Sequence, residues 1–178
     1  MIELYSLMLV LAAFCGFIGL LRGWNRELIV TIAVVIALFA LFQFDSLLRG
    51  VILRSVPVEQ TFIFQLIVFL FIVYIGYKST FFGIGGEEAE EGKVQDAILG
   101  GVVGAINGYL IGGAVWYLLD INEYPFAPHV MAPAPNSASA DAINTLPLVI
   151  ISGGLTGSGI LAVIGIAALI LLVLFSAS

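Results

Sequence analysis

The sequence predicts an all-α membrane protein, a bundle of about five transmembrane helices around a glycine-rich packing core. Composition is the first observation: 61% of the 178 residues are hydrophobic, 10% are charged and the mean hydropathy is +1.16, far from the values of soluble domains. The second is a series of long apolar runs, each able to cross a bilayer as a helix. The third is that the sequence lacks the alternating pattern that builds a transmembrane barrel.

The ionisable residues exclude several classes of function. The net charge is −6 and the basic residues are scattered among the ends of the apolar runs, so nucleic acid is not an expected partner. His129 is the only histidine and Cys15 the only cysteine, which leaves no ligand set for zinc. We therefore predict no catalytic residues, no metal site and no cofactor, and we expect that the protein is not an enzyme.

The first apolar run, residues 4–21, would extend about 27 Å as a helix, close to the thickness of the hydrocarbon core. We expect a retained span rather than a signal peptide, because no basic segment precedes it. Gly23 can supply the left-handed residue that ends a helix, and Asn25 is predicted to cap the next one. Glu27 falls in the first turn of the second span, predicted over residues 28–44, where helix amide groups favour a negative charge.

The segment after the second span carries apolar residues at helical spacing. We predict a short interfacial helix within residues 45–59, and an ordinary loop with some apolar residues is the alternative. The third span is predicted over residues 57–77, beginning near Pro57 because proline suits the first turn of a helix. An acidic segment follows, which we interpret as a solvated charge run rather than a metal site. Its glutamates are Glu87, Glu88, Glu90 and Glu91.

The fourth span, residues 97–119, has Asp96 as its predicted cap and a row of glycines along one side. The row consists of Gly100, Gly104, Gly108 and Gly112. Because apolar burial does not drive helices together in lipid, such a row predicts close packing against another helix. The expected partner is the first span, with the glycines Gly16, Gly19 and Gly23. We also expect Asn107 to bond to a neighbouring helix or to a backbone carbonyl, since an unpaired amide in a span is costly.

The remainder of the chain divides into a loop and a fifth span. Residues 120–146 are rich in proline, alanine and serine and are predicted as an extramembrane loop. A fifth transmembrane helix with a short tail is predicted over residues 147–178, either as one tilted helix or broken near residues 153–159. Residues 1–119 then form a four-helix membrane region.

The basic residues near the span ends predict the orientation. One side of the membrane carries Arg22, Arg26, Lys78 and Lys93, and the other carries Arg49 and Arg54. Because cytoplasmic ends are enriched in lysine and arginine, we expect the N-terminus outside and the C-terminus in the cytoplasm.

A contact site is predicted directly after the first span, at Arg22, Trp24 and Arg26. We hypothesise that these residues bind anionic lipid headgroups or the acidic segment on the same side of the membrane. The two arginines would share a face if helical turns continued between them. A role in setting the topology alone is the alternative.

Two stretches of the chain, GFIGLLRGWNREL and AILGGVVGAINGYLIGG, resemble the colicin V production protein (CvpA) family of bacterial inner-membrane proteins. The likeness covers about the first 119 residues, and the matching positions of the first stretch are Gly16, Gly19, Arg22, Gly23, Arg26 and Glu27. The resemblance implies a multi-pass protein of the inner membrane with a role in bacteriocin production or export, or in envelope function. It brings no catalytic residues, and the loop and the fifth span depart from the four-helix pattern of the family.

Three hypotheses of function follow. The first is an inner-membrane protein that supports export or envelope function through helix packing. The second is a small accessory or structural subunit of a larger membrane complex. The third, a transporter component or an intramembrane enzyme, is the weakest, because such proteins need ionisable groups at depth. The expected partners are membrane lipids and either a membrane protein or a second copy of the chain.

Overall fold

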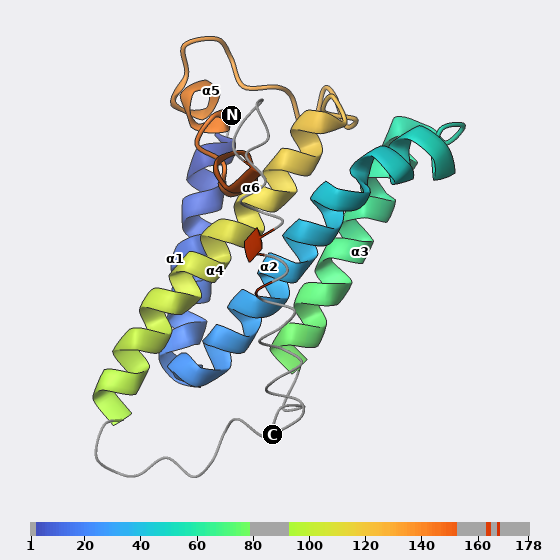
Figure 1. Cartoon of the computed structure of the whole chain (residues 1–178). Helices are drawn as coiled ribbons and strands as arrows, with labels where there is room; N and C mark the ends of the chain where they lie inside the picture. The colour runs from blue at the N-terminus through green and yellow to red at the C-terminus, as the bar shows by residue number, and fades with distance from the viewer. Residues whose placement is uncertain (1–2, 79–92, 153–162, 165–166, 168–178) are drawn as a thin grey trace.

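The computed structural model describes residues 3–78, 93–152, 163–164 and 167. Within these residues every regular element is helical, and four helices are long and apolar enough to cross a membrane. The four helices lie along one another in Figure 1. The prediction of an all-α, multi-pass membrane protein is confirmed. Of the predicted fifth span, residues 147–178, the structure describes the short helix α6, Pro147–Ser152, and most of the remaining residues lie outside the described part of the chain. A fifth membrane-spanning helix stays a prediction.

A single residue joins α1, Leu4–Arg22, to α2, Trp24–Leu47. This residue is Gly23, whose φ of 80° lies in the region that glycine adopts without steric cost. The predicted helix end at Gly23 is therefore present, and Glu27 lies in the first turn of α2 as predicted. The prediction that Asn25 caps the second span is wrong. Because α2 begins directly after Gly23, Asn25 lies inside its first turn.

Beyond α2 the chain continues as one π-helical turn, η1, Leu48–Ile52, before α3, Val58–Lys78. The backbone N–H of Leu53 donates to the carbonyl oxygen of Leu48 at 2.7 Å, which is the wider spacing of a π-helix. The predicted interfacial helix is therefore an extension of α2 rather than a separate helix. Helix α3 follows Pro57, as predicted for the third span.

The fourth long helix, α4, Lys93–Ile121, begins earlier than predicted. Asp96 consequently lies in its first turn, and the prediction that Asp96 caps this helix is wrong. The region after α4 contains turns and one short helix that the sequence analysis did not predict, α5, Ala138–Ile143. Ser137 caps α5 by accepting a hydrogen bond from the backbone N–H of Ala140 at 3.1 Å.

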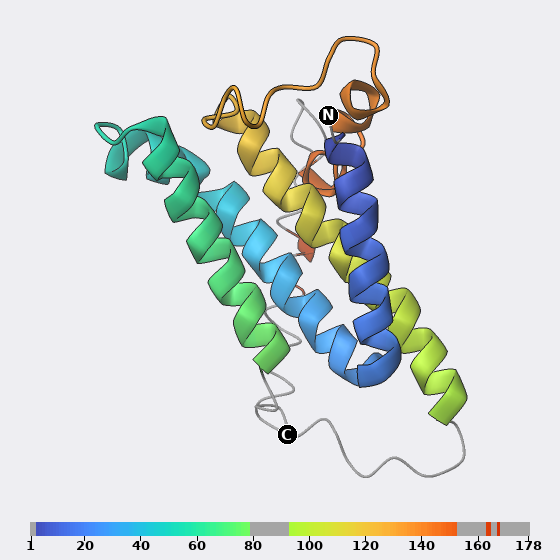
Figure 2. The same cartoon turned by 180° about the vertical axis from the view of Figure 1, so that it is seen from behind.

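The helices pack in a fixed order across the bundle. Helix α1 packs along α4, and α2 lies between α4 and α3, as both views show (Figure 1 and Figure 2). The apolar core forms where α2 meets its two neighbours. Val30, Val34 and Leu38 of α2 are fully buried there, together with Phe69 of α3 and Leu118 of α4.

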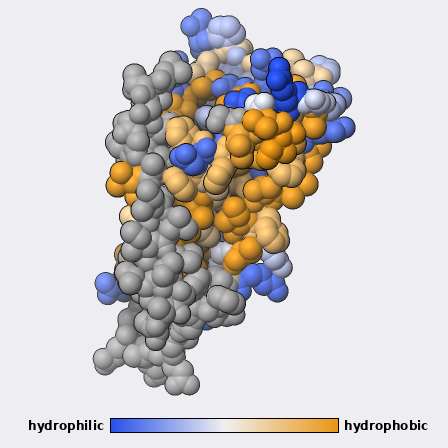
Figure 3. All heavy atoms as spheres, turned by 45° about the vertical axis from the view of Figure 1, so that its right-hand side comes forward, coloured by the Kyte–Doolittle hydropathy of each residue, from blue (hydrophilic) through white to orange (hydrophobic). Residues whose placement is uncertain are grey.

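The outer surface of the bundle is apolar, as contact with lipid requires. Figure 3 shows a broad hydrophobic area across the middle of the molecule, with hydrophilic side chains gathered mainly toward its two ends. Exposed apolar side chains come from α1 and α3, and Phe17, Ile67 and Phe71 are examples. We call the end that holds Gly23 the hinge end, and the end that holds residues 120–146 the loop end (Figure 1).

Candidate functional site

Helices α1 and α4 approach each other closely along a set of glycines that we call the glycine seam. The seam consists of Gly16 and Gly19 of α1 and of Gly100, Gly104, Gly108 and Gly112 of α4. A Cβ atom built on Gly104 would lie 2.5 Å from the carbonyl oxygen of Cys15, and one built on Gly108 would lie 2.7 Å from the Cα atom of Ala12. Backbone atoms cannot move aside as a flexible side chain can, so these two positions require glycine at this helix separation.

The seam is tight at Gly19 and Gly100 as well, where a Cβ atom on either glycine would collide with the backbone of the other. Two positions have more room. A Cβ atom on Gly16 would lie 3.1 Å from the Cβ atom of Ala105, and one on Gly112 would lie 3.1 Å from a methionine side-chain carbon. Close approach of this kind replaces apolar burial as the source of helix association in lipid.

The start of α4 also contacts the hinge, by which we mean Gly23, the single residue that joins α1 to α2. Oδ1 of Asp96 accepts a hydrogen bond from the backbone N–H of Trp24 at 3.3 Å. The first N–H groups of a helix have no partner within it, so Asp96 satisfies one of them at the start of α2, where a negative charge also suits the helix dipole. A Cβ atom on Gly23 would run into the same carboxylate. Asp96 therefore caps α2 across the bundle instead of capping its own helix.

A cluster of buried and half-buried polar side chains lies beside the hinge. We call Arg22, Glu27, Thr31 and Asn107 the hinge cluster. Nη1 of Arg22 donates to Oε1 of Glu27 at 2.7 Å. Nδ2 of Asn107 donates both to the backbone carbonyl oxygen and to Oε2 of Glu27, each at 3.0 Å, and the Thr31 hydroxyl donates to Oδ1 of Asn107 at 2.8 Å. Glu27 and Asn107 are fully buried, and both carboxylate oxygens are bonded, as a buried charge requires.

Arg22 extends this cluster to α3. Its Nη2 donates to the backbone carbonyl oxygen of Tyr77 at 3.1 Å, and its guanidinium carbon lies 4.7 Å from the centre of the Tyr77 ring. Arg22 belongs to α1, Glu27 to α2, Tyr77 to α3 and Asn107 to α4. One continuous set of polar contacts therefore joins all four long helices.

The three residues of the predicted contact site lie in different surroundings. Arg22 points into the bundle and is half-buried, whereas Trp24 and Arg26 are exposed. The two arginines do not share a face, because the helix ends at Gly23. Contact of Trp24 and Arg26 with lipid headgroups stays a prediction. Contact with the acidic segment falls outside the described residues.

Sequence reasoning missed the burial of Glu27 and the parts that Thr31 and Tyr77 play. Glu27 lies in the first turn of α2, as predicted, but it is fully buried rather than solvated. The sequence did contain one indication of this cluster. Asn107 lies in the middle of a span, where a side-chain amide needs a hydrogen-bonding partner. Glu27 and Thr31 are four residues apart at the start of an apolar run, which places both on one helix face.

A second polar network joins α2, η1, α3 and α4 at the loop end. Nδ2 of Asn122 donates to Oε1 of Gln65 at 2.8 Å, and Nε2 of Gln65 donates to Oδ1 of Asp45 at 3.2 Å. Arg49 forms two hydrogen bonds of 2.8 Å to the Asp45 carboxylate. Gln65 and Asn122 are buried, so this network closes the loop end of the core.

The two polar sets are suited to holding helices in place. In the hinge cluster, where Glu27 is fully buried, removing Arg22 would leave the carboxylate charge uncompensated, at a cost of about 3–5 kcal/mol. Across the described ranges, no three histidine, cysteine or acidic side chains gather as metal ligands do. His129 is exposed, and Cys15 is buried.

Comparison with known proteins identifies one family. The family model described as colicin V production protein matches residues 6–146. The match therefore extends through the loop, beyond the 119 residues to which the motifs point. No curated protein and no solved structure matches the chain.

Proposed function

Since the chain belongs to the colicin V production protein family, we propose that it supports export or envelope function in the bacterial inner membrane. It does so through helix packing, as a membrane protein that catalyses no reaction. The observation that carries this proposal is the glycine seam, which brings the backbones of α1 and α4 together without intervening side chains.

The hinge cluster supports a packing role because it sets the register between helices. Sliding α4 by one helical turn, about 5.4 Å, would separate Asn107 from Glu27. The buried carboxylate of Glu27 would then lose one hydrogen bond and its backbone carbonyl oxygen another, and lipid can replace neither. The glycine seam brings α1 close to α4, and the hinge cluster fixes the register between the helices. Together they make α1, α2 and α4 a unit of defined geometry.

The orientation of this unit is part of the proposal. Arg22, Arg26, Lys78 and Lys93 belong to the hinge end, whereas Arg49 and Arg54 belong to the loop end. We place the hinge end in the cytoplasm because short cytoplasmic connections are rich in basic residues. The loop end, with α5, then faces outward.

A role as an accessory subunit of a larger membrane complex is the second candidate. Helix α3 lies at one side of the bundle in both cartoon views (Figure 1 and Figure 2). It exposes large apolar side chains such as Phe64, Phe71 and Tyr74. A membrane protein or a second copy of the chain would pack on this side. Such a complex would survive mild detergent as a stoichiometric assembly, whereas the first candidate purifies without a fixed partner.

Complementation tests the packing role. A bacterial strain that lacks its own copy of the gene would receive the wild-type chain, Gly104→Leu, His129→Ala or Cys15→Ser, and leakage of a periplasmic enzyme would be measured. We expect Gly104→Leu to fail, because it separates α1 from α4, and the other two variants to restore the envelope. An active Gly104→Leu variant together with an inactive His129→Ala variant, both present at wild-type levels, would place the activity in the loop instead.

A further inference from the structure

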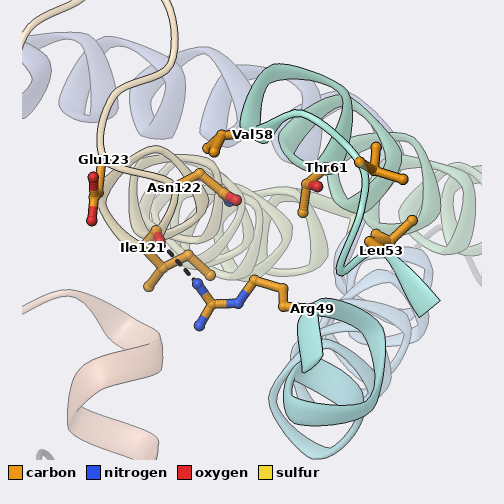
Figure 4. Close-up of a pocket in the computed structure, with 8 residues that line it drawn as sticks. Arg49, Leu53, Val58, Thr61, Ile121, Asn122 and Glu123 are labelled. Atoms are coloured by element: carbon orange, nitrogen blue, oxygen red, sulfur yellow. Dashed lines mark hydrogen bonds between the residues drawn. The ribbon is translucent and has the colours of Figure 1, made fainter. Parts of the chain in front are cut away.

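A small pocket lies at the loop end, between η1, the start of α3 and the end of α4 (Figure 4). Its volume is about 260 Å³, below the range of pockets that enclose drug-sized ligands. The polar lining consists of Arg49, Thr61, Asn122 and Glu123, and the apolar lining includes Leu53 and Val58. None of these residues belongs to the glycine seam, so the proposed packing role does not explain this pocket.

Arg49 brings unused hydrogen-bond donors to the pocket. A guanidinium group has five N–H groups. Nε and Nη2 of Arg49 each donate to the Asp45 carboxylate at 2.8 Å, and Nη1 donates to the backbone carbonyl oxygen of Ile121 at 2.9 Å, the contact drawn in Figure 4. Two N–H groups remain, and the side chain is 39% exposed. They are suited to the oxygens of an anionic group.

Two nearly buried side chains in the pocket wall have unused hydrogen-bonding atoms. Thr61 is 5% exposed, and its hydroxyl makes no hydrogen bond to any residue that the structure describes. Asn122 is 3% exposed and donates both amide protons, to Gln65 and to the carbonyl oxygen of Leu118. Its own carbonyl oxygen accepts no hydrogen bond within the described residues. Among the described residues only the Tyr77 hydroxyl is a fully buried side-chain polar atom without a hydrogen-bond partner, so the Thr61 and Asn122 oxygens are open to the pocket. Both can therefore hydrogen-bond to a ligand with donors and acceptors.

The charges around the pocket favour a zwitterionic ligand. Asp45 neutralises Arg49, and Glu123 adds a further carboxylate to the lining. A purely anionic ligand would therefore meet an excess of negative charge. An ammonium group with N–H donors suits Glu123 and the carbonyl oxygen of Asn122, while an anionic oxygen suits the remaining donors of Arg49.

The position of the pocket indicates the membrane as the source of this ligand. The pocket lies where α2, α3 and α4 reach the loop end, and all three are long enough to span a bilayer. Val51 and Ile52, next to the lining residue Leu53 in the chain, are 70% and 57% exposed, as apolar side chains in contact with acyl chains would be. We propose that the pocket binds the headgroup of a phospholipid with a phosphoethanolamine group. The phosphate lies at Arg49 and the ammonium lies at Glu123 and Asn122.

Native mass spectrometry of the full chain in mild detergent tests this proposal. The protein would be titrated separately with dihexanoyl phosphatidylethanolamine, phosphatidylcholine and phosphatidylglycerol, and with free phosphoethanolamine. We expect one bound phosphatidylethanolamine, with phosphatidylcholine weaker because its quaternary ammonium has no N–H donor and phosphatidylglycerol weaker because it has no cation. Equal binding of the three lipids would overturn the headgroup assignment. Binding of free phosphoethanolamine as tight as that of the lipid would overturn the membrane source.

Two variants test whether phosphatidylethanolamine binds in this pocket. Thr61→Val removes a hydroxyl that holds no described residue in place, so folding is retained, and Glu123→Gln removes the exposed carboxylate. Each should weaken phosphatidylethanolamine binding about tenfold, the loss expected for one hydrogen bond to a charged group. Asp141→Asn removes an exposed carboxylate of α5, outside the pocket lining, and serves as the matched control. Unchanged affinity in both pocket variants, or an equal loss in the control, would place the lipid elsewhere.

Discussion

The side-chain amide of Asn107 donates one N–H to the backbone carbonyl oxygen of Glu27 and the other to its carboxylate, both at 3.0 Å. The two residues are fully buried and 80 positions apart in the chain. Arg22 neutralises the charge of Glu27 from the other side. A residue in the middle of α4 therefore recognises the first turn of α2, and the hairpin of α1 and α2 can dock on α4 in only one register.

We expect Asn107→Ala to destabilise the bundle strongly. The substitution leaves the buried Glu27 carboxylate with one hydrogen bond fewer, at a cost of about 3 kcal/mol, whereas the Glu27 carbonyl oxygen can still accept from the Thr31 hydroxyl at 3.0 Å. The measurement is the apparent Tm in mild detergent. Asn25→Ala is the matched control, because Asn25 is exposed in the first turn of α2. Equal Tm values for the two variants would show that the amide bonds contribute nothing to stability.

The glycine seam predicts that a leucine inside the seam lowers the apparent Tm, whereas a leucine outside it does not. Gly104→Leu places a side chain against the backbone of α1, where a Cβ atom alone would lie 2.5 Å from the Cys15 carbonyl oxygen. Overpacking of this kind should cost about 3 kcal/mol and lower the apparent Tm. Gly50→Leu adds the same side chain in η1, where a Cβ atom would meet nothing within 4 Å beyond its own helical turn, and should leave the Tm unchanged. A Gly104→Leu protein as stable as Gly50→Leu would rule out a close seam.

The loop end contains a tyrosine, Tyr124, whose hydroxyl loses its proton only at strongly alkaline pH. Burial, together with the charge of Asp120, raises the pKa of Tyr124 to about 12. Its hydroxyl accepts from Nε1 of Trp116 at 3.1 Å and donates to the Asp120 carboxylate at 3.2 Å. The folded state favours the protonated hydroxyl, so this contribution to stability is complete below the ordinary tyrosine pKa of about 10 and is lost as the pH rises through about 12.

The tyrosinate absorbance at 295 nm measures this titration. The difference between the wild type and Tyr124→Phe, recorded in lipid nanodiscs, should have its midpoint near pH 12. Asp120→Asn should move that midpoint downward, because it removes the negative charge beside the hydroxyl. A midpoint near pH 10 in the wild type would contradict the buried, hydrogen-bonded position of Tyr124.

Cysteine labelling tests the proposed orientation. In a Cys15→Ser background, Ala138→Cys lies at the loop end and Arg26→Cys at the hinge end, and both side chains are exposed. A membrane-impermeant maleimide added to intact cells with a permeable outer membrane should label Ala138→Cys only. Arg26→Cys should react after the inner membrane is opened. The reverse pattern would place the hinge end outside.

The four membrane-length helices could be predicted from the sequence because bilayer thickness sets the length of an apolar run. The end of α1 at Gly23 could be predicted for a local reason, since glycine is the residue that most readily takes a positive φ. The same local reasoning failed at Asn25 and Asp96. Both are good capping residues, but the cap of α2 comes from Asp96 on another helix, and sequence spacing does not reveal that contact.

The burial of Glu27 could not be predicted from position alone. A glutamate at the end of an apolar run is ordinarily solvated, and only the docking of α4 brings Asn107 against it. The π-helical turn of η1 was missed because propensity does not distinguish its wider hydrogen bonding from that of an α-helix. The helix α5 has a local cap, Ser137, but only six residues, and it lies in a segment rich in proline, alanine and serine that predicts a loop. The pocket at Arg49 combines residues from three elements and has no signature in the sequence.

The most direct test of a packing role is a covalent lock across the glycine seam. A Cβ atom on Gly16 would lie 3.1 Å from that of Ala105, and a small shift of one helix brings the pair to the separation of about 3.8 Å that a disulfide requires. The double variant Gly16→Cys and Ala105→Cys, in a Cys15→Ser background, should form a disulfide on oxidation, and each single variant should not. We predict that the oxidised, locked protein protects the envelope as well as the reduced protein does. An inactive locked protein whose activity returns on reduction would show that α1 and α4 must separate, as in a transporter, and would contradict a packing role.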